Sequence, residues 1–497
     1  MRSTSTSLRT PAARKAVRAS LVAGGLVVIA AIVVASVGGS GGGGGVRTPP
    51  ASTPGETRVL AEPGVPDEVL VSRLLLTSSP SALVVSADAA PADRARAVEV
   101  SSSRRVPLFV VAPEQTAVVA DELRRLDVQT VVAVGAEIPD FELPQTTDEA
   151  RLGAGVTASD RSDAVVLTTE PAAAVDAELG GAEAIVVPVA DPRASGASVA
   201  AVKEAGDAAV IGVGAAFGTT ERFVERVRLA RTVPELPGGG QLMFPSRRVV
   251  ALYGSPGSAE LGPLGRQDLP ATVRRAQALA AQYDKLSSAP VVPGFEIIVT
   301  VASAEPGYRG AYTNVLDPTV IEPWVDAAAQ AGIYVTLDLQ PGRMDFLSQA
   351  QMYRSLLERP NVGLALDPEW RIKNDQVHLE QIGSVTPAEV NRTAAWLADL
   401  VRSKGLPQKA FVLHQFDADM LGDRTRLDTS HPELAVVLHA DGHGTPAVKM
   451  GTWNRMIAGL PPNIWMGWKN FYTEDKPMFS PAATMDVRPT PYFISYQ

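Results

Sequence analysis

The sequence predicts an α/β protein in three parts: an N-terminal transmembrane segment, a duplicated flavodoxin-like α/β region, and a (β/α)8 barrel of the TIM type. Three observations favour this organisation: one uncharged apolar run, an internal repeat at an offset of roughly 80 residues, and recurring strand and helix patterns in the second half. With 497 residues, the chain is too long for one ordinary core. We expect a cytoplasmic basic segment, a membrane segment, a linker, the duplicated region and the barrel at 1–20, 21–37, 38–55, 56–232 and 245–497.

Composition narrows the class of protein. Hydrophobic residues make up 45% and charged residues 20% of the chain, as in globular proteins. The net charge of −9, without a basic stripe, argues against a nucleic-acid partner. The absence of cysteine excludes disulfides, thiolate zinc sites and a cysteine nucleophile. The fold therefore depends on packing.

The N-terminal segment predicts export. A basic stretch without acidic residues, 1–20, precedes the uncharged run Leu21–Val37, which would extend about 25 Å as a helix. An uncleaved membrane anchor is favoured, and a signal peptide cleaved near Ala35 to Gly38 is the alternative. In both cases the positive-inside rule places the folded part outside the cytoplasmic membrane. The Gly- and Pro-rich stretch 38–55 is expected to be a flexible spacer.

Two copies of one α/β unit follow the spacer. The first copy reads "ALVVSAD", "VPLFVVAPEQ", "TAVVADELRRLD" and "VQTVVAVGAEI", and the second reads "DAVVLTTE", "AEAIVVPVADP", "ASVAAVKEAG" and "DAAVIGVGAAF". Gly135 and Gly214 end corresponding strands, and Val84 corresponds to Val165. An internal duplication explains this order economically.

At these segments the chain resembles the cell wall-binding repeat 2 family. The resemblance lies in the order "VVSAD", "PLFVVAPEQ", "ADELRRL" and "TVVAVG", and it covers about 160 residues of the duplicated region. The stretch "DAAPADRAR" stands where that family usually has an "NFPDAL"-type segment. The resemblance implies attachment to anionic cell-wall polymers, and a duplicated scaffold without a ligand is the alternative.

The second half predicts the barrel. A Pro- and Gly-rich linker at Val233–Gly240 precedes apolar strand patterns at 247–254, 295–303, 333–342, 362–370, 410–417, 434–442, 463–471 and 491–497. Helical patterns lie between most of them, which is typical of a (β/α)8 barrel. The interval 472–490 shows no clear helix, so the barrel is expected to be either incomplete or closed by a last strand without its outer helix.

Polar residues gather where these strands end, the position of active sites in such barrels. We expect substrate contacts from Tyr253, Asp338, Gln340, His414, Gln415, His439, Trp468 and Lys469, and catalysis from Asp367, Glu369, Asp417 and Asp441. Asp367 and Glu369 are two apart, about 6.6 Å along an extended segment, so both can face one site. Glycosidic cleavage needs one carboxyl group as acid and a second as nucleophile or base. Glu369 is the favoured acid, with its partner among Asp417, Asp441 and Asp338.

The sequence therefore predicts a glycoside hydrolase-type barrel, resembling such barrels in general order, that acts on a cell-wall or extracellular polysaccharide. Aromatic faces for sugar rings are expected from Trp370, Trp465, Trp468 and Tyr472. No cofactor is expected. Two alternatives remain open: a glycan-binding protein without catalysis, and a hydrolase holding a metal on Asp338, Asp367, His414, His439 and Asp441. No HxH or HExxH spacing, nucleophilic serine elbow or phosphate loop is present.

Overall fold

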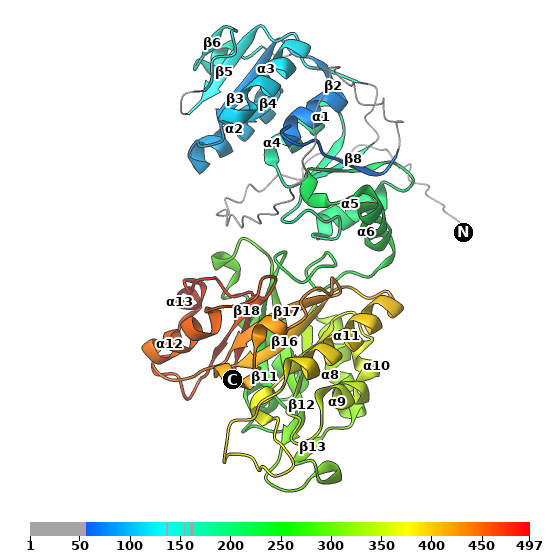
Figure 1. Ribbon diagram of the computed structural model, residues 1–497, viewed down its shortest axis with the longest axis vertical. Coiled ribbons are helices and arrows are strands. Elements are labelled where there is room, and N and C mark those ends of the chain that lie inside the picture. The colour runs from blue at the N-terminus through cyan, green and yellow to red at the C-terminus, as the bar shows by residue number, and fades with distance from the viewer. Residues whose placement is uncertain (1–55, 136–137, 154, 160–163) are drawn as a thin grey trace, which may run out of the picture. The chain divides into compact units, whose positions relative to one another are not determined.

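The computed structural model describes residues 56–135, 138–153, 155–159 and 164–497 (Figure 1). The predicted cytoplasmic segment, membrane segment and spacer, 1–55, lie outside the described residues. Among the residues that are described, no helix has both the length and the apolar character needed to cross a membrane.

Two four-stranded parallel sheets form the region before the linker. The first has the order β4-β3-β5-β6, with bounds β3 (Ser81–Ser86), β4 (Leu108–Val111), β5 (Thr130–Val134) and β6 (Gln145–Thr146). The second has the order β9-β8-β10-β1, with bounds β8 (Val165–Thr168), β9 (Glu183–Val186), β10 (Val210–Val213) and β1 (Arg58–Leu60). In each sheet the three successive strands of a copy take the flavodoxin-like order second, first, third. This common order is what a duplication produces.

The two sheets differ in their fourth strand. The first sheet takes β6 from directly after its third strand, whereas the second takes β1 from the start of the described chain. With three residues, β1 is too short to show a periodic pattern in the sequence. A further antiparallel pair, β2 (Leu76–Ser78) with β7 (Thr157–Ala158), was also not expected.

Helices connect the strands of this region. Their bounds are α1 (Asp67–Leu75), α2 (Pro91–Arg104), α3 (Thr116–Arg125), α4 (Pro171–Leu179), α5 (Gly196–Glu204) and α6 (Thr220–Thr232). Gly135 and Gly214, after the third strand of each copy, have φ of 78° and 109°, where glycine is favoured. A Cβ atom would lie 2.9 Å from Asp93 Oδ2 at Gly135 and 2.7 Å from Asp67 Oδ2 at Gly214. The two glycines thus serve both the turn and the close approach of a helix.

Eight parallel strands form a closed barrel in the second half, as the sequence predicts. They are β11 (Arg248–Gly254), β12 (Val291–Ala302), β14 (Tyr334–Leu339), β15 (Val362–Leu366), β16 (Lys409–Gln415), β17 (Leu434–Ala440), β18 (Trp465–Asn470) and β19 (Phe493–Tyr496). Closure is complete because β11 pairs with β12 on one side and with β19 on the other. A short strand, β13 (Thr313–Val315), pairs antiparallel with the end of β12.

The outer helical layer is less regular than the barrel. It consists of α7 (Leu269–Ala280), α8 (Pro318–Gln330), α9 (Phe346–Met352), α10 (Arg354–Leu357), α11 (Pro387–Lys404), α12 (Pro446–Ile457) and α13 (Pro481–Met485). Between β16 and β17 the chain forms two 3-10 turns, η8 (Ala418–Met420) and η9 (Arg424–Arg426). The interval before β19 contains only the five-residue α13. The last strand therefore closes the barrel with little helical cover.

The barrel interior changes character along its axis. At the amino ends of the strands, Phe244, Trp465 and Tyr492 pack with ring centroids 4.8 to 5.7 Å apart. Small buried side chains such as Ala251, Ala365 and Ala410 occupy the next inward positions. The larger apolar residues of the same strands alternate outward and pack against the helices. Polar side chains take the inward positions at the carboxyl ends.

Candidate active site

Every barrel strand contributes a buried polar side chain to the carboxyl end of the interior, which we call the mouth. Strand alternation explains the set: on β16, Ala410 and Val412 face the interior, so His414 does too. The mouth residues are Tyr253, Glu296, Thr336, Asp338, Asp367, His414, His439, Asp441, Lys469 and Ser495. The register places His414 beside His439, and His439 beside Gly467, at one level of the barrel.

His414 lies at the centre of the mouth. Its Nδ1 is 3.0 Å from Asp441 Oδ2, and its Nε2 is 3.0 Å from Glu296 Oε1. Because both ring nitrogens face carboxylates, both donate when the ring carries two protons. Burial alone would lower the pKa of His414, but Glu296, Asp338 and Asp441 raise it well above its ordinary value. The imidazolium form is thus the stable one here.

Asp441 follows β17 and is the ionised member of the site. Burial would raise its pKa, but the hydrogen bond and the charge of His414 lower it overall. Its second oxygen, Oδ1, is buried and receives no hydrogen bond from any described residue. His414 therefore satisfies one of the two carboxylate oxygens of Asp441.

Tyr253, Asp338 and Lys469 form a second group in the mouth. The Tyr253 hydroxyl donates to Asp338 Oδ2 at 2.7 Å, and Lys469 Nζ lies 3.7 Å from the centre of the Tyr253 ring. Burial raises the pKa of Asp338 to about 6, with Glu296 adding to the rise and His414 opposing it. Burial, followed by the charge of Asp338, raises the pKa of Tyr253. The tyrosine is therefore a neutral donor.

Asp367 and Glu369 follow β15 around the short turn η7 (Pro368–Trp370). Burial and then repulsion by Glu369 raise the pKa of Asp367 well above its ordinary value. Burial and then the charge of Asp441 raise the pKa of Glu369 to about 7. Glu369 is thus close enough to influence the pKa of Asp367, and the sequence-based expectation that the two carboxyl groups share one substrate site stays a prediction.

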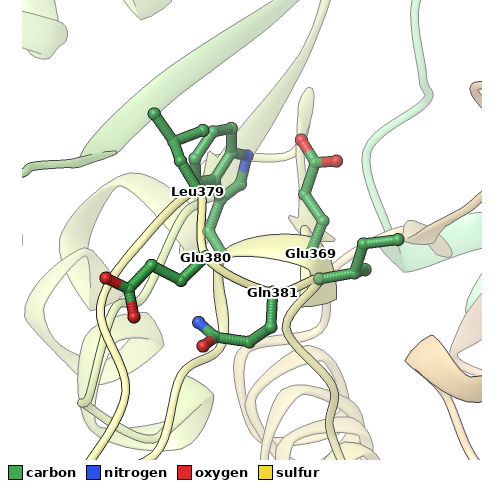
Figure 2. A pocket seen from close by; sticks show the side chains of 6 residues that line it. Glu369, Leu379, Glu380 and Gln381 are labelled. Carbon is green, nitrogen blue, oxygen red and sulfur yellow. The ribbon is translucent and has the colours of Figure 1, made fainter.

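Glu369 also borders a surface pocket. The pocket has a volume of about 370 Å³ and is lined by Glu369, Trp370, Leu379, Glu380, Gln381 and Ile382. Figure 2 shows the Glu369 carboxylate pointing away from the side chains of Glu380 and Gln381. Unlike Asp367, which is 2% exposed, Glu369 is only partly buried. It connects the buried mouth with space that is open to a ligand.

His439 is the neutral histidine of the mouth. Burial and the charge of His414 lower its pKa well below the ordinary value. Its Nε2 is 3.2 Å from Ser495 Oγ, and its ring centre is 4.8 Å from that of His414. A Cβ atom on Gly467 would come within 2.5 Å of His439 Cδ2, so the glycine provides the room for this ring.

Two predicted substrate contacts point away from the mouth. Gln415 and Trp468 are neighbours of the inward His414 and Lys469, so alternation turns both outward. Gln415 Nε2 donates to the backbone oxygen of Asp417 at 3.0 Å. The Trp468 ring is buried against Trp453 and Phe479, with ring centroids 5.4 and 5.1 Å apart. The predictions for Gln415 and Trp468 need correction because they ignored this alternation.

The side chains of Gln340 and Asp417 accept hydrogen bonds from backbone amides near the strand ends. Gln340 Oε1 accepts a hydrogen bond from the Ala302 amide at 3.0 Å, which ties β14 to the end of β12. The Asp417 carboxylate accepts from the Asp419 amide at 3.0 Å and caps η8. In place of the predicted substrate and catalytic roles, the structure gives these two side chains loop-holding contacts. Of the candidate partners for Glu369, Asp338 and Asp441 lie in the mouth.

The aromatic residues expected to contact sugars are also scattered. Trp370 lines the pocket beside Glu369, but Trp465 packs at the opposite end of the barrel. Tyr472 packs on Tyr496, with ring centroids 5.6 Å apart, and the Arg275 guanidinium lies over its ring. Only Trp370 is in position to line a ligand site beside the acid.

Sequence reasoning missed Glu296, Thr336 and Ser495. All three lie inside apolar strand patterns, before the strand ends that were searched. A glutamate within the apolar run "FEIIVTVA" was the available signal, because a charge inside a barrel strand requires an inward polar partner.

One set of metal-ligand type occurs among the described residues. Single ligand atoms of Glu296, His414 and His439 lie within 4.8 Å of one another. The donor chemistry suits zinc. However, both nitrogens of His414 already face carboxylates, so a metal would have to displace one of these contacts and the proton.

No family model matches the chain, and no curated protein matches it. Among solved structures, the xylanase and alpha-amylase inhibitor protein XAIP-II from Scadoxus multiflorus covers 50% of this chain and 92% of its own, at 12% identity and a TM-score of 0.30. A quadruple mutant of the alpha-N-acetylgalactosaminidase NagBb from Bifidobacterium bifidum covers 46% of this chain and 43% of its own, at 10% identity and a TM-score of 0.22. The glycoside hydrolase family 6 enzyme CcCel6C from Coprinopsis cinerea covers 49% of this chain and 62% of its own, at 13% identity and a TM-score of 0.21. Similarities at this level do not indicate a function for the chain.

Proposed function

We propose that the barrel is a glycoside hydrolase acting on a cell-wall or other extracellular polysaccharide, with Glu369 as general acid and Asp441 as the second carboxylate. One observation carries the proposal. Two interacting carboxyl groups, Glu369 at the border of the mouth and Asp441 within it, have pKa values displaced in opposite directions, Glu369 upward to about 7 and Asp441 downward. Environments that separate two carboxyl pKa values in this way assign the acid and the base of a hydrolytic site.

The contacts support a division of labour. Below about pH 7, Glu369 is mostly protonated and can give its proton to the leaving glycosidic oxygen. Asp441 stays ionised and either attacks the anomeric carbon or takes a proton from the attacking water. His414 holds one oxygen of Asp441 and so acts as a positioning residue. The pocket beside Glu369 offers space for the leaving group.

The location of the protein is part of the same proposal. The basic flank and the apolar run 21–37 support export and anchoring, and the resemblance to cell wall-binding repeat 2 sequences supports attachment to wall polymers. Protease added to intact spheroplasts is expected to digest the part of the chain after Gly45. Full protection would contradict export.

Glu369→Gln tests the chemistry. The substitution keeps the shape of the side chain and removes its transferable proton, so kcat on a wall glycan is expected to fall about 10²–10⁴-fold while binding persists. Glu305→Gln is the matched control, because Glu305 is an exposed carboxylate that follows β12 at the same end of the barrel. Equal activity of Glu369→Gln and the unmutated protein contradicts the proposal. If the protein binds glycans but cleaves none between pH 4 and 8, it is a glycan-binding protein and the proposed enzyme activity is wrong.

A metal-dependent hydrolase is the second candidate, favoured by the spacing of Glu296, His414 and His439. The two candidates differ in their response to a chelator. Prolonged dialysis against a chelator is expected to leave an acid–base glycosidase active, whereas loss of activity that zinc restores would establish the metal mechanism.

A further inference from the structure

The loop after β15 returns to Glu369 and forms the pocket beside it. The Gly383 amide donates to the backbone oxygen of Glu369 at 2.7 Å, and the Ser384 amide donates to that of Arg371 at 3.0 Å. A Cβ atom on Gly383 would lie 2.4 Å from the Glu369 oxygen, so this close approach requires glycine. The returning segment is therefore held against the residue proposed as general acid, and both segments line the pocket of about 370 Å³.

Apolar side chains border this pocket and remain exposed to solvent. Leu379 is 88% exposed and Ile382 is 53% exposed, and no other large apolar side chain among the described residues is as exposed as Leu379. We call these two side chains the apolar rim. Trp370 lines the same pocket with its Nε1 atom buried, so its indole presents carbon atoms to the space. Single exposed apolar residues are common, but two that border one pocket together with a tryptophan indicate a binding surface.

Leu379 is also held in an unfavourable backbone conformation. Its φ is 68°, a left-handed value that glycine and asparagine adopt far more readily than leucine. The preceding His378 is anchored, with its Nε2 atom 2.9 Å from the backbone oxygen of Tyr312. Figure 2 shows the Leu379 side chain and the Glu369 carboxylate pointing to the same side, away from Glu380. Backbone strain of this kind persists mainly at functional sites, and here it holds an apolar side chain in solvent next to the acid.

The polar groups of the pocket suit a neutral ligand with few hydroxyl groups. Both charged lining residues, Glu369 and Glu380, are acidic, so the lining offers no cation to an anionic ligand. The Gln381 amide is engaged in its own loop, where Nε2 donates to the backbone oxygen of Val377. A sugar ring in this position would need polar partners, because burying a hydroxyl group without one is costly. The volume of about 370 Å³ is near the lower end of the ~300–1,000 Å³ found for small-molecule sites, so one ring or a short chain fits it.

We propose that this pocket binds the leaving group of the hydrolysed substrate, and that this group is a neutral, apolar alcohol with an alkyl or aryl chain. The inference rests on the proposed function, in which Glu369 is the acid. The substrate class is then a glycan joined by a glycosidic bond to an apolar aglycone. When the bond between the anomeric carbon and the glycosidic oxygen breaks, that oxygen takes the proton of Glu369 and leaves as the alcohol, while water supplies the hydroxyl group of the released sugar. Leu379 and Ile382 are specificity residues that shield the apolar chain from water.

Calorimetry with the full-length protein and small alcohols tests the class of ligand, because the leaving group can be supplied without knowledge of the sugar. The probes are 1-hexanol, 1-butanol and sorbitol, whose six-carbon chain carries a hydroxyl group on every carbon. We expect saturable binding of 1-hexanol, weaker binding of 1-butanol by up to about 4-fold per methylene group removed, and no binding of sorbitol.

Two variants locate the binding. The double variant Leu379→Asn/Ile382→Asn removes the apolar rim and is expected to weaken 1-hexanol binding about 10- to 100-fold. Asparagine tolerates the left-handed conformation at position 379, so the melting temperature is expected to stay unchanged or to rise, which separates lost binding from lost folding. Val448→Asn is the matched control, because Val448 is 56% exposed on α12, outside the pocket. It is expected to bind 1-hexanol as the unmutated protein does.

Three results would overturn the proposal. Sorbitol that binds as tightly as 1-hexanol contradicts an apolar site, and 1-hexanol binding that survives in the double variant lies elsewhere on the chain. Dimerisation that the double variant abolishes, without 1-hexanol binding, would assign the rim to a second copy of the chain. The proposed function fails separately. If 1-hexanol binds at the rim but no glycan is cleaved, only the enzyme activity is wrong, and if Glu369 cleaves glycans without 1-hexanol binding, only the leaving group is wrong.

Discussion

The two ends of strand β16 place buried bases in opposite electrostatic situations. Lys409, at the amino end, is fully buried and donates to the backbone oxygens of Arg359 and Val362, and burial lowers its pKa to about 7. His414, at the carboxyl end, is equally buried, yet its carboxylate neighbours raise its pKa. Both side chains are buried, so the charge of their partners decides whether the pKa is lowered or raised. The partners of Lys409 are backbone carbonyl groups, which do not offset the effect of burial, whereas the carboxylate partners of His414 more than offset it.

The largest expected effect comes from removing the base at the carboxyl end. His414→Leu leaves Glu296 and Asp441 buried without their cation, which is expected to cost about 3–5 kcal/mol of unfolding free energy at pH 7. Urea denaturation measures this loss. His443→Gln, at an exposed histidine just after β17, is the control and is expected to stay within about 0.5 kcal/mol. Equal effects of the two variants would show that the mouth carboxylates do not depend on His414.

A smaller loss of stability is expected from a substitution that crowds the ring of His439, which lies beside His414 in the barrel. Gly467→Ala places a methyl group against the ring of His439 and is expected to cost about 1–3 kcal/mol in a thermal or urea melt. Gly451→Ala is the control, because Gly451 lies inside α12, where the nearest atom to an added Cβ is the flexible end of Arg455 at 3.8 Å. It is expected to be neutral or stabilising by up to about 1 kcal/mol. A neutral Gly467→Ala would mean that the His439 ring is loosely held.

A third effect is a dependence of stability on pH, and it comes from Lys409. Its folded pKa is lowered to about 7, so the folded state binds this proton less well than the unfolded chain, and stability rises as the pH increases from about 7 to 10. The slope for one group is at most about 1.4 kcal/mol per pH unit. Lys409→Met is expected to remove this rise, and Lys404→Met, at an exposed lysine, to keep it. Urea denaturation between about pH 7 and 10 measures the unfolding free energy of both variants. If stability still rises with pH in Lys409→Met, the rise does not come from Lys409.

His414 has the opposite sign. Its folded pKa is raised, so its contribution to stability is fully present below about pH 6.5 and is lost as the pH rises through the folded value. The two bases on one strand are therefore expected to give opposite slopes, which separates them in a single set of pH-dependent melts.

Sequence reasoning predicted the barrel because its strands are apolar, regularly spaced and joined by amphipathic segments, and these local patterns survive in the fold. It missed β1, whose three residues pair with β10 far along the chain, since distant pairing leaves no local signal. At the carboxyl ends of the strands, the sequence indicated His414, Asp441 and Glu369, but it did not show which of the residues next to them face the barrel interior. One residue of register separates the inward Lys469 from the outward Trp468. Glu296 was overlooked because it lies within a strand.

The pH dependence of kcat/KM on a cleaved wall glycan tests the central claim most directly. If Glu369 is the acid, kcat/KM decreases as the pH rises through about 7. If Asp441 must be ionised, kcat/KM also decreases when the pH is lowered, but only below the ordinary aspartate pKa. Glu369→Gln is expected to lose the fall near pH 7 along with most of the rate, whereas Glu305→Gln keeps the full profile. An alkaline limb near pH 7 that persists in residual Glu369→Gln activity would show that another group donates the proton.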